Sequence, residues 1–301
     1  MSSRHLTRTS ALASCIAAAA VLLSACAAPA AAPASKAAEG QAAAPAQKDL
    51  LDTIKERGVL RISTDANYAP QSYFDEATKE WTGFDIDVAR EVAKRLGVKI
   101  ELITPDWSAI TAGNWAGRWD ASIGSMTVTP ERKKVLDFTP PYYYTITQFG
   151  VREDLKDQIK SIADLAGKTV CVAESTTYET YLAGKLDIEI VIPPPKDIKV
   201  VSMKTDQDCI QSIQSGRKDF DAVLTTAQVI NDGKKKGVPI DFLDKPPYYE
   251  ALSIAVDKAS APNQKFVEAL SKIVDEMHAD GTLSNLSKKY YDGLDLSKKQ
   301  N

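Results

Sequence analysis

One arginine stands where it could hold a small anion. Arg132 follows Thr129, Pro130 and Glu131, a sequence typical of a first helical turn with proline early in that turn. Its guanidinium carries N–H donors in a planar fork, and this fork matches both oxygens of a carboxylate. The side chain could instead lie on the surface and pair with Glu131 or Asp137. On the residues alone, the surface interpretation is favoured.

Two further segments offer hydroxyl and main-chain donors. Ser125 and Thr127 flank the end of a predicted strand, next to Gly124, which permits close approach of the backbone. In a second region, residues 175–178 follow a strand and begin a helix, and exposed N–H groups at a helix start favour an anion. Each segment could also be a plain turn.

The side chains of two aromatic residues and one carboxylate each have a chemical and a structural interpretation. Tyr68 and Trp107 offer flat apolar faces that also attract cations; lid or core packing is the alternative for Trp107. Asp65 could accept an amine, or it could bond its own backbone in a turn.

Composition excludes several other chemistries. The chain has 301 residues, a formal net charge of −3 and two histidines, His5 and His278. A histidine metal centre or a Ser-His-Asp triad is therefore not expected, and we predict no metal and no cofactor. No basic block is long enough to indicate nucleic-acid binding.

The elements that must position these residues alternate between helices and short apolar strands. This order predicts an α/β fold with mostly parallel, doubly wound sheets. Residues 184–200 are expected to form a long surface excursion. Strands are predicted over residues 59–63, 98–103, 121–123, 168–173, 220–225 and 240–243.

The N-terminus has the pattern of an export signal. Residues 1–26 combine a basic start with an apolar stretch that is too short to span a bilayer, and they end in Leu-Ser-Ala-Cys. This ending resembles a bacterial lipobox, in which Cys26 would be lipidated; an ordinary signal with an incidental cysteine is the alternative. Residues 27–47 are rich in alanine and proline and should form a tether.

Two cysteines remain in the folded part of the chain. Cys171 and Cys209 could form one disulfide or stay as buried thiols. We favour the disulfide, because an exported protein meets an oxidising compartment and because a strand and a neighbouring helix are commonly adjacent.

Four segments together carry a family resemblance. They read LRISTDANYAP at 60–70, WTGFDIDVA at 81–89, GSMTVTPERKKVLDFT at 124–139 and DGTL at 280–283. In order and spacing they are similar to bacterial extracellular solute-binding proteins, family 3, which capture polar amino acids for ABC importers. The similarity extends over residues 50 to about 292.

The resemblance implies a fold and a ligand site. The fold would be the type II two-lobed fold of periplasmic binding proteins, with lobe one at 50–145 plus 252–296 and lobe two at 146–251. Two crossing strands would join the lobes, which close on the ligand by a hinge motion. In this family Arg132 would hold the ligand carboxylate, with Ser125, Thr127 and the Thr177 N–H beside it, while Tyr68, Trp107 and Asp65 would bind the rest of the ligand.

Two positions depart from the family pattern. An aspartate that binds the ligand ammonium is usual where this chain has Thr226, and an aromatic residue is usual at Gln71. A buried ammonium without a counter-charge is costly. Another carboxylate, such as Asp65 or Glu174, could therefore take the amine; otherwise the ligand lacks an ammonium or binds with modest affinity.

The sequence thus predicts a monomeric, exported and lipid-anchored solute-binding protein. It would face the periplasm or the cell exterior and deliver a small carboxylate-bearing solute, an amino acid in the first instance, to an ABC permease. It would touch the membrane only through its anchor and would not bind nucleic acid. The alternative is an enzyme similar to cyclohexadienyl dehydratase, with Glu174 as the acid.

Overall fold

The computed structural model describes residues 47–243, 245–260 and 262–299. The export signal, Cys26 and all but the last residue of the expected tether lie outside the described residues. No helix in the described ranges is long and apolar enough to cross a membrane.

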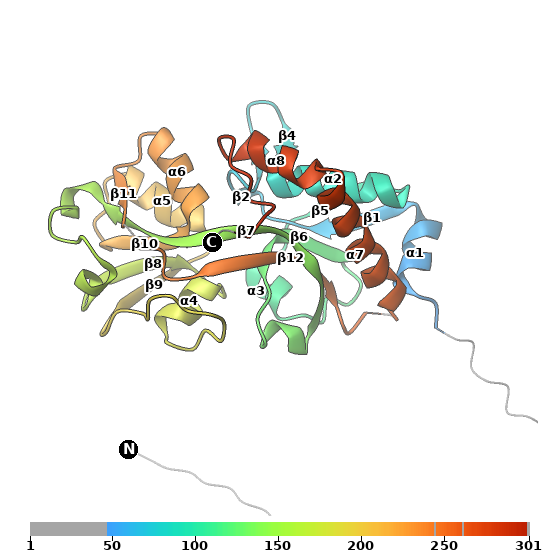
Figure 1. The fold of residues 1–301 in the computed structure, drawn as a ribbon, viewed down its shortest axis with the longest axis horizontal. Coiled ribbons are helices and arrows are strands. Elements are labelled where there is room, and N and C mark those ends of the chain that lie inside the picture. The colour runs from blue at the N-terminus through green and yellow to red at the C-terminus, as the bar shows by residue number, and fades with distance from the viewer. Residues whose placement is uncertain (1–46, 244, 261, 300–301) are drawn as a thin grey trace, which may run out of the picture. The chain divides into compact units, whose positions relative to one another are not determined.

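One group of elements, here called lobe one, is built around three parallel strands (Figure 1). Strand β1 lies between β5 and β6 and runs parallel to both, as the alternating pattern predicts. The strands are β1 (Val59–Ser63), β5 (Lys99–Ile103) and β6 (Ala121–Thr127). The helices are α1 (Leu50–Arg57), α2 (Phe84–Leu96), α3 (Trp107–Thr111), α7 (Gln264–Ala279) and α8 (Thr282–Tyr290).

A second group, here called lobe two, repeats this arrangement. Strand β8 lies between β9 and β10 and runs parallel to both. The strands are β8 (Thr169–Ala173), β9 (Lys199–Met203), β10 (Ala222–Thr226) and β11 (Ile240–Phe242), and the helices are α4 (Thr177–Leu182), α5 (Asp206–Gln214) and α6 (Ala227–Lys235). Short 3-10 helices cover Arg132–Lys134, Glu153–Leu155 and Ile162–Leu165.

Two long strands pass from one lobe to the other. Strands β7 (Leu136–Arg152) and β12 (Tyr249–Asp257) pair antiparallel, with Glu250 opposite Thr145. Since β12 also pairs with β6 and β7 also pairs with β10, one nine-stranded ladder runs through both lobes. Figure 1 shows β7 and β12 passing between the two groups of helices.

Some elements differ from the sequence prediction. A small antiparallel sheet of β2 (Asn67–Tyr68), β3 (Ser72–Asp75) and β4 (Glu80–Thr82) was not expected, because its strands are too short to show an apolar period. Strand β9 begins at the end of the predicted surface excursion, where exposed Lys199 and Val200 hide the strand pattern.

Each lobe has apolar cores of its own. Helix α2 buries Val88, Ala89 and Val92 against lobe one, as its period predicts. Gly83, before this helix, has φ +124°, and a Cβ there would lie 2.3 Å from the Gln71 carbonyl oxygen. Only glycine fits, so the start of α2 fixes the backbone at Gln71.

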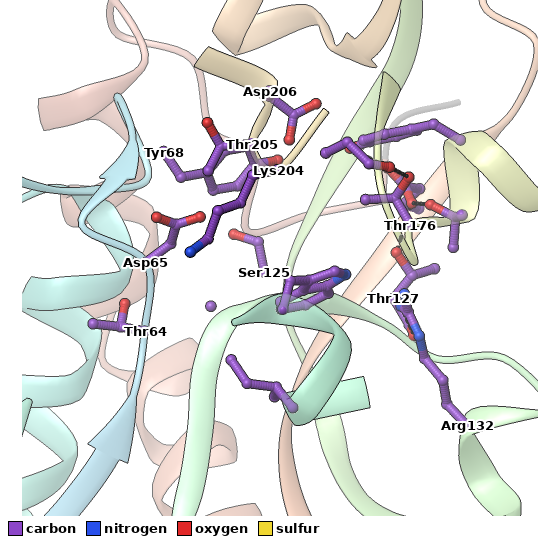
Figure 2. A pocket seen from close by; sticks show the side chains of 17 residues that line it. Thr64, Asp65, Tyr68, Ser125, Thr127, Arg132, Thr176, Lys204, Thr205 and Asp206 are labelled. Carbon is purple, nitrogen blue, oxygen red and sulfur yellow. Dashed lines mark hydrogen bonds between the residues drawn. The ribbon is translucent and has the colours of Figure 1, made fainter. Parts of the chain in front are cut away.

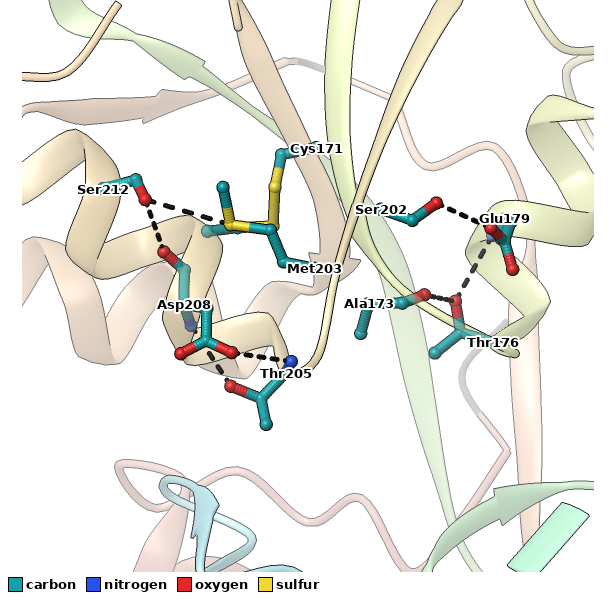
Figure 3. Close-up of a disulfide and its surroundings, with 10 residues drawn as sticks. Cys171, Ala173, Thr176, Glu179, Ser202, Met203, Thr205, Asp208 and Ser212 are labelled. Atoms are coloured by element: carbon teal, nitrogen blue, oxygen red, sulfur yellow. Dashed lines mark hydrogen bonds between the residues drawn. A yellow bond between two sulfur atoms is a disulfide. The ribbon is translucent and has the colours of Figure 1, made fainter. Parts of the chain in front are cut away.

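Lobe two contains a disulfide between Cys171 and Cys209, the state that we favoured over two free thiols (Figure 3). It joins β8 to α5, with the two Cα atoms 5.9 Å apart. Helix α5 begins with a capping box: the Thr205 hydroxyl accepts from the Asp208 N–H, and the Asp208 carboxylate accepts from the Thr205 N–H.

Candidate functional site

A cavity lies between the lobes, at the carboxyl ends of their parallel strands (Figure 2). Seven of the eight predicted ligand residues line it; Thr226 does not. The lining residues are Thr64, Asp65, Tyr68, Trp107, Ile110, Gly124, Ser125, Thr127, Arg132, Ala173, Thr176, Thr177, Tyr178, Lys204, Thr205, Asp206 and Glu250.

Arg132 is buried in this cavity, with 8% of its surface exposed. Nη1 donates to the Thr127 carbonyl in lobe one at 3.0 Å, and Nη2 donates to the Ser175 carbonyl in lobe two at 3.3 Å. The surface alternative is wrong for this structure, because Glu131 pairs with Lys134 and no carboxylate of the described residues lies within ion-pair distance of the guanidinium.

Burial lowers the pKa of Arg132 to about 10, although the charge of Glu250 opposes this effect. The guanidinium also lies over the Trp107 ring, 5.4 Å from its centroid, and Trp107 Nε1 donates to the Ser175 carbonyl at 3.2 Å. Trp107 therefore covers Arg132 and links the two lobes. A desolvated cation with no ion-pair partner among the described residues favours an anionic ligand.

The contacts of Ser125 contradict its predicted role as a hydrogen-bond donor to an anion. Its hydroxyl donates to Asp85 at 2.7 Å, and its N–H donates to the Tyr142 hydroxyl at 2.9 Å. Both hydrogens are thus used inside lobe one, although the residue lines the cavity. Burial raises the pKa of Asp85 to about 7, while its bonds to Ser125 and Tyr142 lower it.

Glu250 is a site residue that the sequence analysis missed. It lies on β12, is 2% exposed and accepts from Thr127 Oγ1 and Thr177 Oγ1, each at 2.6 Å. It also accepts from Thr147 Oγ1 at 3.0 Å and the Tyr178 hydroxyl at 3.4 Å. A threonine hydroxyl has one hydrogen, so those of Thr127 and Thr177 can only accept from a ligand. The expected hydroxyl donors are therefore turned toward Glu250.

Asp65 and Tyr68 line the cavity and also make structural contacts within the fold. Asp65 lines the cavity while its Oδ1 accepts from the Asn67 N–H at 2.7 Å, and burial raises the pKa of Asp65. Tyr68 lines the cavity and packs against the apolar cluster of lobe two that contains Cys171 and Val223. Thr177 is the first residue of α4.

Asp206 is the second missed residue. It begins α5, is 8% exposed and lines the cavity (Figure 2). Burial raises the pKa of Asp206 to about 7; the nearby Thr225 hydroxyl opposes this effect, and the charges of Asp65 and Glu250 add to it. The capping box of α5 uses only Thr205 and Asp208. The additional aspartate between them was the sequence feature that could have indicated a ligand-binding role for Asp206.

Comparisons with known proteins identify the family. Residues 60–293 match the family described as bacterial extracellular solute-binding proteins, family 3. The chain belongs to this family. It is 31% identical to the "Probable amino-acid-binding protein YxeM" of Bacillus subtilis, over 77% of this chain and 84% of that protein. It is also 31% identical to the "L-cystine-binding protein TcyA" of the same organism, over 83% and 87%.

Solved structures agree with this family 3 assignment. The ancestral amino acid-binding protein AncCDT-1, "a precursor of cyclohexadienyl dehydratase", is 32% identical over 81% of this chain and all of that chain, with a TM-score of 0.68. An ancestral arginine-binding protein bound to arginine is 32% identical over 78% and 99%, with a TM-score of 0.68. The predicted type II two-lobed fold is confirmed.

The family 3 position that usually carries an aspartate is turned away from the cavity. The Thr226 hydroxyl caps α6 by accepting from the Val229 N–H at 3.4 Å, and it accepts from Gln71 Nε2 at 3.1 Å. The expected ligand role of Thr226 is therefore corrected: Gln71 and α6 use its oxygen. Glu174 is exposed and does not line the cavity. In the ranges that the structure describes, no acidic, histidine or cysteine cluster could hold a metal.

Proposed function

We propose that this family 3 protein is the solute-binding component of an ABC importer and captures a small carboxylate-bearing solute, an amino acid in the first instance. The observation that carries the proposal is Arg132, a buried cation without a carboxylate partner among the described residues, in a cavity between two lobes. The relatives named as amino-acid- and cystine-binding proteins support a role in amino acid transport.

Arg132 also gives a physical reason for hinge closure. Its two hydrogen bonds end on carbonyl groups of different lobes, at Thr127 and Ser175. A carboxylate on Arg132 would meet lobe-two groups only when the lobes are together, so it would bind the closed state better than the open one. Ligand capture and closure would therefore be one equilibrium.

A ligand screen tests the binding function. We expect thermal stabilisation of the purified exported protein by one or a few amino acids, measured against a panel of amino acids, organic acids and amines. The dehydratase alternative is tested in the same preparation by adding prephenate or arogenate. Turnover of either compound would contradict a pure binding function, and the exposed position of Glu174 speaks against it.

We also propose that Cys26 carries the lipid anchor and that residues 27–47 tether the folded part to the membrane. The basic, apolar and Leu-Ser-Ala-Cys segments of the signal support this. We expect the Cys26→Ala variant to move from the detergent phase to the aqueous phase in detergent partitioning, as a soluble monomer. Continued membrane attachment of that variant would refute the anchor.

A further inference from the structure

One carboxylate of the cavity has an oxygen that no described residue satisfies. Asp206 is buried, with 8% of its surface exposed. Its Oδ1 accepts no hydrogen bond from the described residues. Such a buried oxygen is costly unless a donor reaches it. The Thr225 hydroxyl lies near this carboxyl and also has no hydrogen-bond partner in the described ranges. Because the Asp206 side chain lines the cavity, a bound ligand could supply a further donor.

The cations nearby are already engaged. Lys204 also lines the cavity, but its Nζ pairs with Asp106 of lobe one at 2.6 Å. Arg132 binds two carbonyl groups, and Figure 2 shows its side chain and that of Asp206 on different sides of the cavity. Asp206 therefore has no ion-pair partner among the described residues.

The other acidic side chains are less suited to an ammonium. Glu250 is satisfied by hydroxyl groups from both lobes, and Asp65 accepts from the Asn67 N–H. Glu174 is exposed, outside the cavity lining. Asp206 is the carboxylate with an open, buried acceptor.

The disulfide holds the Asp206 end of α5 in place. Cys209 lies one turn after Asp206, and its bond to Cys171 ties this turn to β8, whose end enters the cavity at Ala173 (Figure 3). The N-terminal turn of α5 also favours a negative charge. Both features position the carboxylate before a ligand arrives.

We propose that Asp206 binds the ligand ammonium and thereby selects α-amino acids over carboxylates without an amine. This inference rests on the function proposed above and deepens it: Arg132 of lobe one takes the carboxylate, and Asp206 of lobe two takes the amine. The ammonium subsite then lies at the start of α5, because the Thr226 position is occupied by its bond with Gln71.

Calorimetry with matched ligands tests the assignment. The probes are arginine, histidine, glutamine and cystine, each with its deamino analogue, titrated into the exported wild-type protein and the Asp206→Asn variant. We expect wild type to bind at least one amino acid about 30-fold or more tighter than its deamino analogue. In Asp206→Asn this ratio should fall to within about threefold of unity, with the affinity for the deamino analogue nearly unchanged.

Two control variants separate the possible outcomes. Asp65→Asn removes the charge of the lobe-one carboxylate in the cavity. This variant should largely keep the ratio of the affinities for an amino acid and its deamino analogue. Arg132→Ala should remove binding of both members of a pair. A ratio unchanged in Asp206→Asn, or a wild type that binds deamino analogues equally well, overturns the Asp206 assignment and leaves the Arg132 function standing. Absence of binding by every probe refutes the proposed function as well.

The pH dependence of ligand affinity distinguishes a binding role of Asp206 from a purely structural one. The acidic and phenolic groups facing Asp206 are Asp65, Glu250, Tyr68 and Tyr178. Because the pKa of Asp206 lies near 7 and an ammonium binds its ionised form, wild-type affinity should rise with pH from about 6 to 8. The profile of Asp206→Asn should be flat over this interval; a persisting rise contradicts the proposal.

Discussion

Gln71 Nε2 of lobe one donates to the Thr226 hydroxyl of lobe two at 3.1 Å, with 0% and 1% of the two residues exposed. These are the two positions at which the chain departs from its family pattern, and they contact each other. The backbone at Gln71 is held by its close approach to Gly83. The two departures therefore meet in one buried hydrogen bond between the lobes.

Replacing Thr226 by valine should destabilise the protein. The variant loses the acceptor of a buried amide and the cap of α6, so we expect the free energy of unfolding to fall by about 1–3 kcal/mol. Thr226→Ser keeps the hydroxyl and is the matched control. Urea unfolding measures both variants, and a valine variant as stable as wild type would show that the pair contributes nothing.

Glu250 should favour the closed cleft before any ligand binds. It bonds Thr127 of lobe one and Thr177 of lobe two, so Glu250→Ala or Thr177→Val should shift the ligand-free protein toward open forms. Thr147→Val removes a Glu250 contact from a crossing strand and should change closure little. Distances between spin labels on the two lobes measure the populations. Equal shifts in Thr147→Val and Thr177→Val would contradict a role of Glu250 in linking the two lobes.

The sequence predicts much of this molecule because much of it is encoded locally. The apolar period of α2 and the capping box at Thr205 each specify one element without help from distant residues. Most of the predicted cavity residues follow strand ends, where parallel sheets place their ligands. Local patterns therefore carry both the fold and the outline of the site.

The remaining features depend on contacts between distant segments. Glu250 carries no motif, and its role arises only when β6, β7 and α4 converge on it. The burial of Asp206 likewise depends on how the lobes meet, and so does the contact of Gln71 with Thr226. Hydrogen-bond direction was also hidden: Ser125 and Thr127 are at the predicted place, but their hydroxyl hydrogens point to Asp85 and Glu250.

Asp85 should make stability depend on pH. Burial raises its pKa from 3.8 to about 7, so between these values the folded state holds a proton that the unfolded state releases. Its contribution is complete below pH 3.8 and is lost as pH rises through 7, a change of up to about 4 kcal/mol. Asp85→Asn should reduce the pH dependence of the unfolding free energy over this window, measured by urea titration, and Asp206, whose pKa burial also raises to about 7, should account for part of the remainder. A variant that keeps the wild-type slope would contradict this.

The disulfide should stabilise lobe two. Cys171 and Cys209 are 38 residues apart, and removing such a link commonly costs about 2–4 kcal/mol. We expect a Cys171→Ser, Cys209→Ser double variant to unfold at lower denaturant concentration than the oxidised protein. Its stability should not respond to reductant, whereas the wild type should approach it when reduced. Identical midpoints for oxidised wild type and variant would exclude a stabilising role.

Arg132 gives the most direct test of the anion site. Its guanidinium is buried, bonded to both lobes and without a carboxylate partner among the described residues, so Arg132→Ala should weaken ligand binding by about 2–5 kcal/mol. Arg132→Lys keeps the charge but loses the planar fork, and we expect a smaller loss because only a single donor geometry remains. Calorimetry measures both variants, with circular dichroism to show that they fold. If the lysine and alanine variants bind the ligand as tightly as wild type, the negative group of the ligand binds elsewhere. Ligand capture would then not depend on Arg132.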